Sequence, residues 1–226
     1  MVEGSPNTPM PFAHQFVVFA LRFGVLKFGR FELKSGRISP YFFNAGLFCT
    51  GRTLGELFTY YAARCNGIPD MPNKIVFGLA YKGIPLAAGT ATRLWDKYRV
   101  DVPYAFNRKE VKDHGEGGST VGAPITVDVV IVDDVITSGT SVRESVAIIE
   151  AHGGRATDLV IALDRQERGA NITLSAVQQV EQEYGIVVHP IATMATIIEV
   201  LETGGEEYAT LDHFEAMLRY RDQYGV

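Results

Sequence analysis

One short segment combines residue types that suit the binding of a phosphorylated sugar. Residues 129–141 read VVIVDDVITSGTS, so four branched apolar residues run directly into two carboxylates, Asp133 and Asp134. Hydroxyl side chains around Gly139 follow within a few positions. The apolar run predicts a buried strand, and the residues after the glycine have the apolar spacing of a helix. This combination of strand, acidic pair, hydroxyl-rich turn and helix predicts a binding site rather than a simple strand-to-helix loop.

The start of the predicted helix suits an anion. Free peptide N–H groups and hydroxyls can surround a phosphate there, and Gly139 lets the backbone come close. Carboxylates do not bind phosphate, but they suit ribose hydroxyls or a Mg²⁺ ion shared with a diphosphate. Phosphoribosyl pyrophosphate carries all of these groups. The alternative is a turn whose Asp and Thr side chains only cap the helix.

A second segment has the charge to neutralise a departing diphosphate. Residues 106–118 read FNRKEVKDHGEGG and concentrate positive charge on Arg108, Lys109, Lys112 and His114. The glycines near its end favour mobility. A basic loop of this kind can close over a diphosphate, exclude water and stabilise the charge of the leaving group. The alternative is a solvated surface loop, because acidic residues interrupt the basic run.

An alternation of strands and helices must position these segments. Apolar runs occur at 74–80, 127–133, 158–164 and 185–191, with another strand candidate at 102–107, and helical patterns occur at 84–98, 139–152, 172–184 and 206–221. This order predicts an α/β fold with a central, mostly parallel sheet flanked by helices. Ligands bind at the carboxyl ends of such strands, where Tyr81, Lys82 and Arg165 stand beside the acidic pair.

The region before the first long strand reads differently. Phenylalanines recur at helical spacing from Phe12 to Phe23, and residues 51–66 also have a helical pattern. Aromatic residues mixed with Gly and Pro at 31–46 predict short strands and turns outside the main sheet. We therefore expect a small hood of one helix and short strands at about residues 11–50, within a single domain spanning residues 1–226.

Composition excludes several classes of protein. The 226 residues carry a net charge of −5, which argues against a general nucleic-acid-binding surface. No apolar run approaches the roughly 20 residues of a membrane span, and no signal-peptide pattern is found. The two cysteines have no metal-ligand spacing, so we expect free thiols and a reducing, cytoplasmic location.

The 129–141 segment resembles the phosphoribosyl-pyrophosphate signature of the type I phosphoribosyltransferases. Four more segments, at 31–46, 77–87, 106–118 and 163–169, are similar to the orotate phosphoribosyltransferases in the same order. The resemblance implies the type I phosphoribosyltransferase fold and a mobile catalytic loop at about 107–119. It also implies a Mg²⁺-dependent transfer of the phosphoribosyl group to orotate in pyrimidine biosynthesis. The products would be orotidine 5′-monophosphate and pyrophosphate, formed by displacement at the anomeric carbon.

The resemblance also implies roles for individual residues. Lys109, Asp133 and Asp134 would be catalytic. Contacts to phosphoribosyl pyrophosphate would come from Lys34, Tyr81, Lys82, Arg108, Lys109, Lys112, His114, Asp133, Asp134, Val135, Ile136, Thr137, Ser138, Gly139, Thr140 and Ser141. Contacts to orotate would come from Lys34, Phe42, Phe43, Thr137 and Arg165. Mg²⁺ would be held mainly by the substrate, with Asp133 and Asp134 acting through water.

The same resemblance implies a homodimer in which Lys109 serves the neighbouring subunit's site. Two assignments have simpler alternatives, because Phe42 and Phe43 also suit a core and Arg165 also suits a surface ion pair with Asp164 or Glu167. Two other functions share the 129–141 segment. One is transfer to a purine or to uracil, and the other is a non-catalytic sensor of phosphoribosyl pyrophosphate. Such a sensor usually adds a DNA-binding domain, and the sequence has no obvious helix-turn-helix extension.

Overall fold

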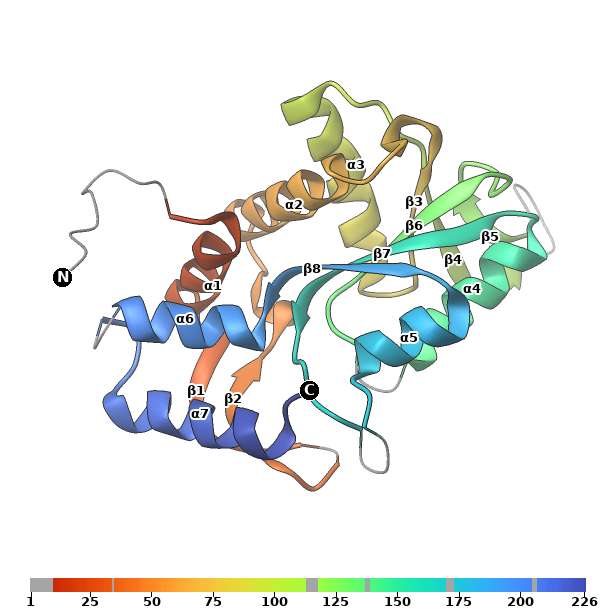
Figure 1. The fold of residues 1–226 in the computed structure, drawn as a ribbon. Coiled ribbons are helices and arrows are strands. Elements are labelled where there is room, and N and C mark those ends of the chain that lie inside the picture. Colours follow the sequence, from red (N-terminus) through yellow and green to blue (C-terminus); the bar gives the residue numbers. More distant parts are fainter. Residues whose placement is uncertain (1–9, 34, 113–117, 137–138, 170–172, 205–206) are drawn as a thin grey trace.

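A six-stranded sheet forms the centre of the protein (Figure 1). The computed structural model describes residues 10–33, 35–112, 118–136, 139–169, 173–204 and 207–226. The strands are β3 (Ile75–Gly78), β4 (Tyr104–Lys112), β5 (Gly118–Gly122), β6 (Asp128–Asp133), β7 (Arg155–Asp164) and β8 (Val187–Thr193). Their order is β5-β4-β3-β6-β7-β8, and β5 alone runs antiparallel to its neighbour. The predicted α/β fold with a mostly parallel sheet is confirmed.

The two faces of this sheet are covered by different helices, because successive side chains of a strand point to opposite faces. Val130 and Val132 pack in one apolar cluster, while Val129 and Ile131 pack in another. The first cluster includes buried residues of α1 (Phe12–Arg22), α2 (Gly51–Asn66), α3 (Gly83–Tyr98), α6 (Met194–Gly204) and α7 (Leu211–Tyr224). The second includes α4 (Thr140–Ala151) and α5 (Ala176–Tyr184). Both faces of the central strands are thus buried, as their unbroken apolar sequence requires.

Reciprocal hydrogen bonds fix where two of these helices begin. Thr50 and Thr53 exchange side-chain-to-backbone bonds at the start of α2, and Ser175 and Gln178 do the same at the start of α5. Each pair satisfies peptide N–H groups that have no acceptor inside the helix. The α2 boundaries equal the predicted range 51–66, whereas α5 begins later than the predicted residue 172.

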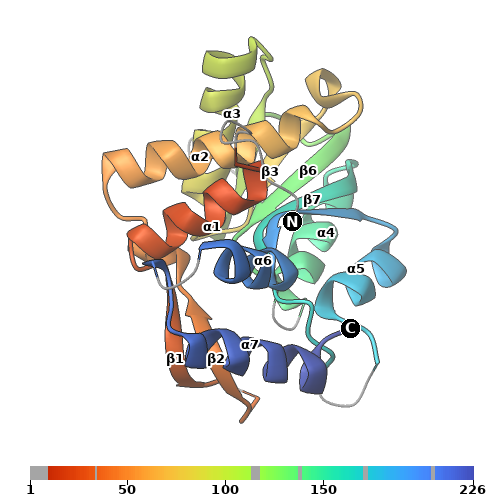
Figure 2. The same cartoon turned by 60° about the vertical axis from the view of Figure 1, so that its left-hand side comes forward.

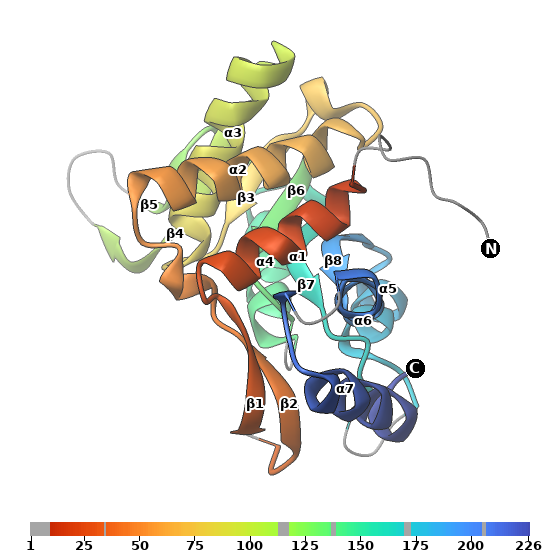
Figure 3. The same ribbon diagram turned by 90° about the vertical axis from the view of Figure 1, so that its left-hand side faces the viewer.

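An antiparallel hairpin of β1 (Leu26–Glu32) and β2 (Ile38–Phe43) stands apart from the large sheet. Figures 2 and 3 both show the hairpin side by side with α7. Its buried Leu26 and Tyr41 belong to the same apolar cluster as Val130 of β6. The predicted hood of one helix and short strands is therefore present and shares its core with the sheet. Short 3₁₀ turns at Ala45–Leu47 and Met71–Asn73 complete the described elements before β3.

Three elements differ from the sequence prediction. Helix α6 was not predicted, because it follows β8 without any intervening turn residue and its apolar run reads as a continuation of the strand. Strand β5 was not predicted either, since its sequence GSTVG is short and begins and ends with glycine. Residues 107–112, predicted as part of a mobile loop, belong to β4. Within the described ranges, no helix has the length and hydropathy of a bilayer span.

Candidate active site

The acidic pair lies at the carboxyl end of β6, and neighbouring elements fix its backbone. The hydroxyl of buried Tyr61, on α2, donates to the Asp133 carbonyl oxygen at 2.7 Å. The peptide N–H of Ala162, on β7, donates to the Asp134 carbonyl oxygen at 2.9 Å. Burial raises the pKa of Tyr61 well above its ordinary value, and the two aspartates raise it further, so this hydroxyl stays a donor. The acidic pair therefore sits in a defined position at the sheet edge.

The two carboxylates have different partners. Asp133 accepts a hydrogen bond from the Asp134 peptide N–H and one from the Ser141 hydroxyl, both at 2.8 Å. Asp134 accepts from the Val135 peptide N–H at 2.9 Å and pairs with the Lys82 Nζ at 2.7 Å. Burial raises the pKa of Asp133, and the hydrogen bond from Ser141 opposes that shift. The site thus holds one carboxylate in an ion pair and one that is desolvated and held by neutral donors.

The helix after the acidic pair begins without a side-chain cap in the part of the chain that the structure describes. Gly139 precedes α4 with φ of 70°, a left-handed conformation that glycine adopts without strain. Peptide N–H groups in the first turn of α4 have no acceptor within the helix. The capping alternative therefore finds no support among the described residues. Thr137 and Ser138 lie outside them, so their predicted roles stay predictions.

The turn from β3 to α3 depends on two glycines that nearly touch. A Cβ atom built on Gly83 would lie 2.6 Å from the Gly78 carbonyl carbon, closer than real contacts allow. The Asn107 side-chain oxygen accepts from the Ala80 peptide N–H at 2.6 Å and fixes the same turn. The turn presents Tyr81, whose side chain is largely exposed, and then Lys82. It therefore delivers Lys82 to the acidic pair.

A cavity of about 710 Å³ lies beside this turn. Phe42 and Phe43 of the hairpin, Lys82, Val135, Ile136 and Arg165 are the predicted site residues that line it. The remaining lining residues are Glu32, Leu33, Ser35, Arg37, Asp164, Gln166, Glu167, Arg168, Gly169, Ala176 and Gln179. Asp133 and Asp134 do not line the cavity, but Asp134 contacts Lys82, which is one of the lining residues. The fold thus brings the hood, the β3–α3 turn, the β6–α4 turn and the end of β7 to one cavity.

Arg165 enters the cavity wall as part of an ion pair. Its Nε donates to the Glu167 carboxylate at 2.8 Å, and its Nη2 donates to the Ser39 hydroxyl at 3.1 Å. The guanidinium lies over the Tyr41 ring, 4.4 Å from the ring centroid. The alternative of a pair with Glu167 is therefore found, but the Arg165 side chain is only 17% exposed and lies at the cavity rather than on open surface.

The two adjacent phenylalanines have separate surroundings. Phe43 packs against the main apolar cluster. Phe42 is 41% exposed and stacks on Phe31, with ring centroids 5.4 Å apart. The core alternative therefore suits Phe43 better than Phe42, whose accessible ring face is available to a planar ligand.

The basic segment is only partly inside the described residues. Arg108 is half-buried, and its Nε is a buried nitrogen without a hydrogen-bond partner among them. The Lys109 Nζ lies 3.3 Å from the Glu144 carboxylate on α4, and Lys109 does not line the cavity. Lys34, the Lys112 side chain and His114 lie outside the described part of the structure, so their predicted roles are untested.

Two supporting residues were not found by sequence analysis. Tyr61 and Asn107 act on main-chain atoms of the site, and nothing in their types or spacing distinguishes them from other buried polar residues. Across the described ranges, no group of three or more His, Cys, Asp or Glu side chains is arranged to hold a metal ion.

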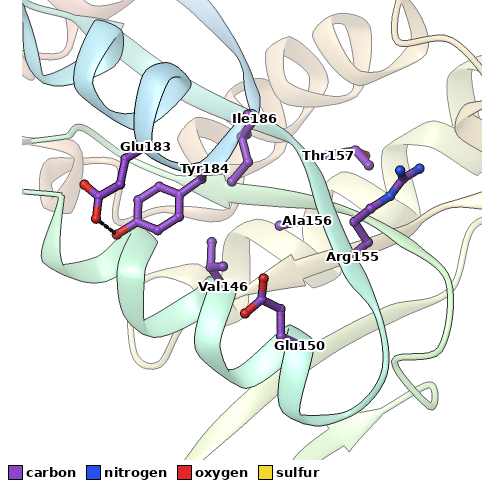
Figure 4. Close-up of a pocket in the computed structure, with 9 residues that line it drawn as sticks. Val146, Glu150, Arg155, Ala156, Thr157, Glu183, Tyr184 and Ile186 are labelled. Carbon is purple, nitrogen blue, oxygen red and sulfur yellow. Dashed lines mark hydrogen bonds between the residues drawn. The ribbon is translucent and has the colours of Figure 1, made fainter.

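A second cavity, of about 500 Å³, lies at the opposite ends of the strands, between α4, α5 and the start of β7 (Figure 4). Its wall includes Glu150, Arg155, Thr157 and Tyr184. The hydroxyl of Tyr184 is already bound to the neighbouring Glu183 at 2.7 Å. None of the predicted site residues lines this second cavity, whereas six of them line the first.

Comparison with known proteins agrees with this geometry. Residues 61–190 match the phosphoribosyl transferase domain family. The orotate phosphoribosyltransferase of Pseudomonas putida strain F1 is 52% identical over 218 residues, covering 96% of this chain and 99% of the relative. The orotate phosphoribosyltransferase of Thioalkalivibrio sulfidiphilus is 54% identical over 216 residues, covering 94% of this chain and 97% of the relative.

A solved structure extends the likeness to three dimensions. The crystal structure of orotate phosphoribosyltransferase from Francisella tularensis superposes with a TM-score of 0.83 at 41% identity, covering 94% of this chain and all of the other. The chain thus shares more than half of its residues with one orotate phosphoribosyltransferase and the fold of another, in both cases over almost its whole length. The chain therefore belongs to the orotate phosphoribosyltransferase family, within the type I phosphoribosyltransferase fold.

Proposed function

We propose that this protein transfers the phosphoribosyl group of phosphoribosyl pyrophosphate to orotate, giving orotidine 5′-monophosphate and pyrophosphate in pyrimidine biosynthesis. Family membership supports the reaction class. The observation that carries the proposal is the shared cavity, in which Phe42 and Arg165 face the same space as Lys82 and the residues after the acidic pair. A base, a sugar and a diphosphate can therefore occupy adjoining positions.

Orotate is a planar anion, and the base end of the cavity matches both properties. The accessible face of Phe42 offers stacking area. Arg165 uses Nε and Nη2 for internal bonds, and no described residue accepts from its Nη1. That remaining edge is available for a ligand carboxylate or carbonyl oxygen. The Lys34 and Thr137 contacts remain predictions from the family resemblance.

The phosphoribosyl group would bind over the turn between β6 and α4. The N-terminus of α4, which no described side chain caps, would hold the 5-phosphate together with the hydroxyls from Thr137 to Ser141, and Ser141 would exchange its bond to Asp133 for the phosphate. Asp133 and Asp134 would accept hydrogen bonds from the ribose hydroxyls. Because the transition state is oxocarbenium-like, their negative charge would also stabilise the positive charge that develops on the ribose. Orotate nitrogen would attack the anomeric carbon from the face opposite the pyrophosphate.

Basic side chains would neutralise the departing pyrophosphate. The Lys82 side chain is 68% exposed, so it can leave Asp134 for a diphosphate oxygen without a large desolvation cost. The buried Arg108 Nε has no hydrogen-bond partner among the described residues, and a ligand oxygen would satisfy it. Lys109 points to Glu144 rather than into this chain's cavity, which supports a homodimer in which Lys109 serves the partner subunit. Tyr81, Lys112 and His114 would complete the pyrophosphate contacts.

The donor set suits a Mg²⁺ ion that the substrate holds. Both carboxylates already accept hydrogen bonds from neighbouring groups, so they fit contacts through water better than a direct metal cage. When bound through the diphosphate and ribose oxygens, Mg²⁺ would supply further neutralisation of the leaving group. Asp133 and Asp134 would orient the water around it.

We further propose that residues 1–226 act as one unit. The hood at about 11–50 would cover the base, and the segment at about 107–119 would close over the pyrophosphate from the end of β4. The cytoplasmic location stays a prediction from cysteine usage and the absence of a signal pattern.

The direct test measures orotate consumption by absorbance with phosphoribosyl pyrophosphate and Mg²⁺. We expect turnover that requires all three components and is lost in the Asp133→Asn/Asp134→Asn double variant. Adenine, hypoxanthine and uracil serve as alternative acceptors in parallel reactions. Turnover of one of these bases with none of orotate would overturn the choice of acceptor, and binding without turnover of any base would favour a sensor.

A further inference from the structure

The Glu167 carboxylate is the centre of a largely buried cluster in the cavity wall, beside Arg165. Its Oε1 lies 2.8 Å from Arg165 Nε and 2.7 Å from Arg165 Nη2. The Tyr41 hydroxyl donates to the same oxygen at 3.4 Å, and the Arg37 guanidinium lies 3.9 Å from the other oxygen. The Glu167 side chain is only 11% exposed. A carboxylate with these partners is held firmly and is not a solvated surface charge.

These contacts determine which part of Arg165 faces a ligand. Glu167 and Ser39 occupy Nε and Nη2, and the Tyr41 ring covers one face of the guanidinium. The planar fork is therefore held in one orientation, and Nη1 is the nitrogen that Glu167 and Ser39 leave for a ligand. Without Glu167, two of the bonds that set this orientation disappear while the arginine keeps its charge and its reach.

Glu167 is itself anchored by the backbone around it. It forms an antiparallel bridge with Gly225, and the Arg168 N–H donates to the Tyr224 carbonyl oxygen at 2.8 Å. The preceding Gln166 has φ of 51° and receives a hydrogen bond from the Val226 N–H at 3.0 Å. The carboxylate is therefore placed by paired main chain rather than by a free loop.

We propose that Glu167 is a positioning residue for the acceptor base, acting through Arg165 and not by touching the base. Its carboxylate neutralises Arg165 within the wall and holds the guanidinium edge toward the anionic ligand. This inference rests on the proposed function and adds a residue that sets the orientation of the base-binding arginine. The effect should appear in orotate binding and not in the binding of phosphoribosyl pyrophosphate.

Steady-state kinetics of the full-length enzyme test the proposal. Glu167→Ala should raise the orotate KM about tenfold or more, the scale of a lost hydrogen bond to a charged group. The KM for phosphoribosyl pyrophosphate should change by less than about twofold, since Glu167 contacts none of the proposed phosphate ligands. The orotate KM of Glu167→Gln should lie between those of wild type and Glu167→Ala, because the amide oxygen still accepts from Arg165 Nε while the charge is lost.

A double-mutant cycle separates positioning from general damage. In an Arg165→Ala background, Glu167→Ala should raise the orotate KM no further, because the residue through which it acts is gone. Asp128→Ala is the matched control, since Asp128 forms the same kind of pair with Arg155, at 3.0 and 2.8 Å, near the amino ends of β6 and β7. That control should leave the orotate KM unchanged.

Two results would overturn the inference while leaving the proposed function intact. One is an additive cycle, in which Glu167→Ala weakens orotate binding equally with and without Arg165. The other is an equal loss in the KM of both substrates. If Glu167→Ala does not fold, the Glu167→Gln cycle carries the same test. A wild-type enzyme that ignores orotate would instead remove the proposed function itself.

Discussion

Replacing Gly83 by alanine tests whether the close approach of the β3–α3 turn is needed for catalysis. The new Cβ would lie 2.6 Å from the Gly78 carbonyl carbon, whereas ordinary contacts begin at 3.4 Å. Either the end of β3 or the start of α3 must therefore move by about 0.8 Å, because the contact is with backbone, which cannot rotate away. The displaced residue adjoins Lys82, whose ion pair with Asp134 is only 2.7 Å long.

Two magnitudes follow from this displacement. Forcing extra volume into a packed site costs about 1–3 kcal/mol, which in a chain of this size lowers Tm by about 2–12 °C. A misplacement near 1 Å in a catalytic constellation reduces the rate by as much as about 100-fold. We therefore expect Gly83→Ala to lower kcat/KM for both substrates about 10- to 100-fold, with a smaller relative loss of stability.

The assay pairs orotate consumption with thermal unfolding followed by circular dichroism. Gly51→Ala is the matched control, because Gly51 is likewise the first residue of its helix but has no atom within 4 Å of a built Cβ. The control should keep full activity and unchanged or slightly higher stability, since alanine suits a helix better than glycine. If Gly83→Ala retained activity within twofold of Gly51→Ala, the close approach would have no role in placing Lys82.

Three further predictions use the same preparations. Lys109→Ala should lower kcat about 100-fold while orotate affinity measured by titration changes little, since the lysine is assigned to the leaving group. Mixing this variant with the Asp133→Asn/Asp134→Asn variant should restore activity if heterodimers form. An unchanged kcat in Lys109→Ala would remove Lys109 from catalysis. Burial opposes ionisation of Asp158, but hydrogen bonds from His189 and its other neighbours outweigh it and lower the pKa to about 2. The stability that this carboxylate contributes is therefore present above the unfolded-state pKa near 3.9 and is lost as pH falls toward about 2. Between these pH values, Asp158→Asn should remove about 1–2 kcal/mol of the acid-induced decrease in the free energy of unfolding, after allowance for screening. If wild type and Asp158→Asn lost stability identically with pH, the role of Asp158 would be refuted. Cys49 is exposed, whereas burial raises the pKa of the Cys65 thiol to about 12, so a thiol reagent at neutral pH should modify one cysteine per native chain and two after denaturation.

Much of the fold follows from patterns that physics imposes on the sequence. The central strands are recognisable because a strand buried on both faces must be apolar at every position, as in residues 129–132. The helix at 51–66 is recognisable from its helical pattern, and the structure adds the capping pair that fixes its start. Helix α6 escaped recognition because β8 passes into it without a turn, and hydrogen bonds between Thr193 and Thr196 at 3.1 and 3.3 Å make that change of direction.

The site divides in a similar way. Asp133, Asp134 and Lys82 were predictable because chemistry dictates their types and the strand ends dictate their place. Tyr61 and Asn107 were not, since each acts on a main-chain atom of a residue far away in sequence, 72 positions for Tyr61 and 27 for Asn107. For Arg165 the structure shows the ion pair with Glu167, while the residue also lines the cavity, so the predicted ligand contact stays a prediction.

The cluster around Arg165 joins parts of the chain that are far apart before folding. Ser39 and Arg165 are separated by 126 positions, as are Tyr41 and Glu167, and Arg37 reaches the Arg168 carbonyl across 131. Closing such long loops carries an entropic cost that local structure cannot offset. The cluster around Arg165 is consequently a product of the finished tertiary structure. A ligand that binds at this cluster would bind only the native form and would therefore stabilise the protein against unfolding.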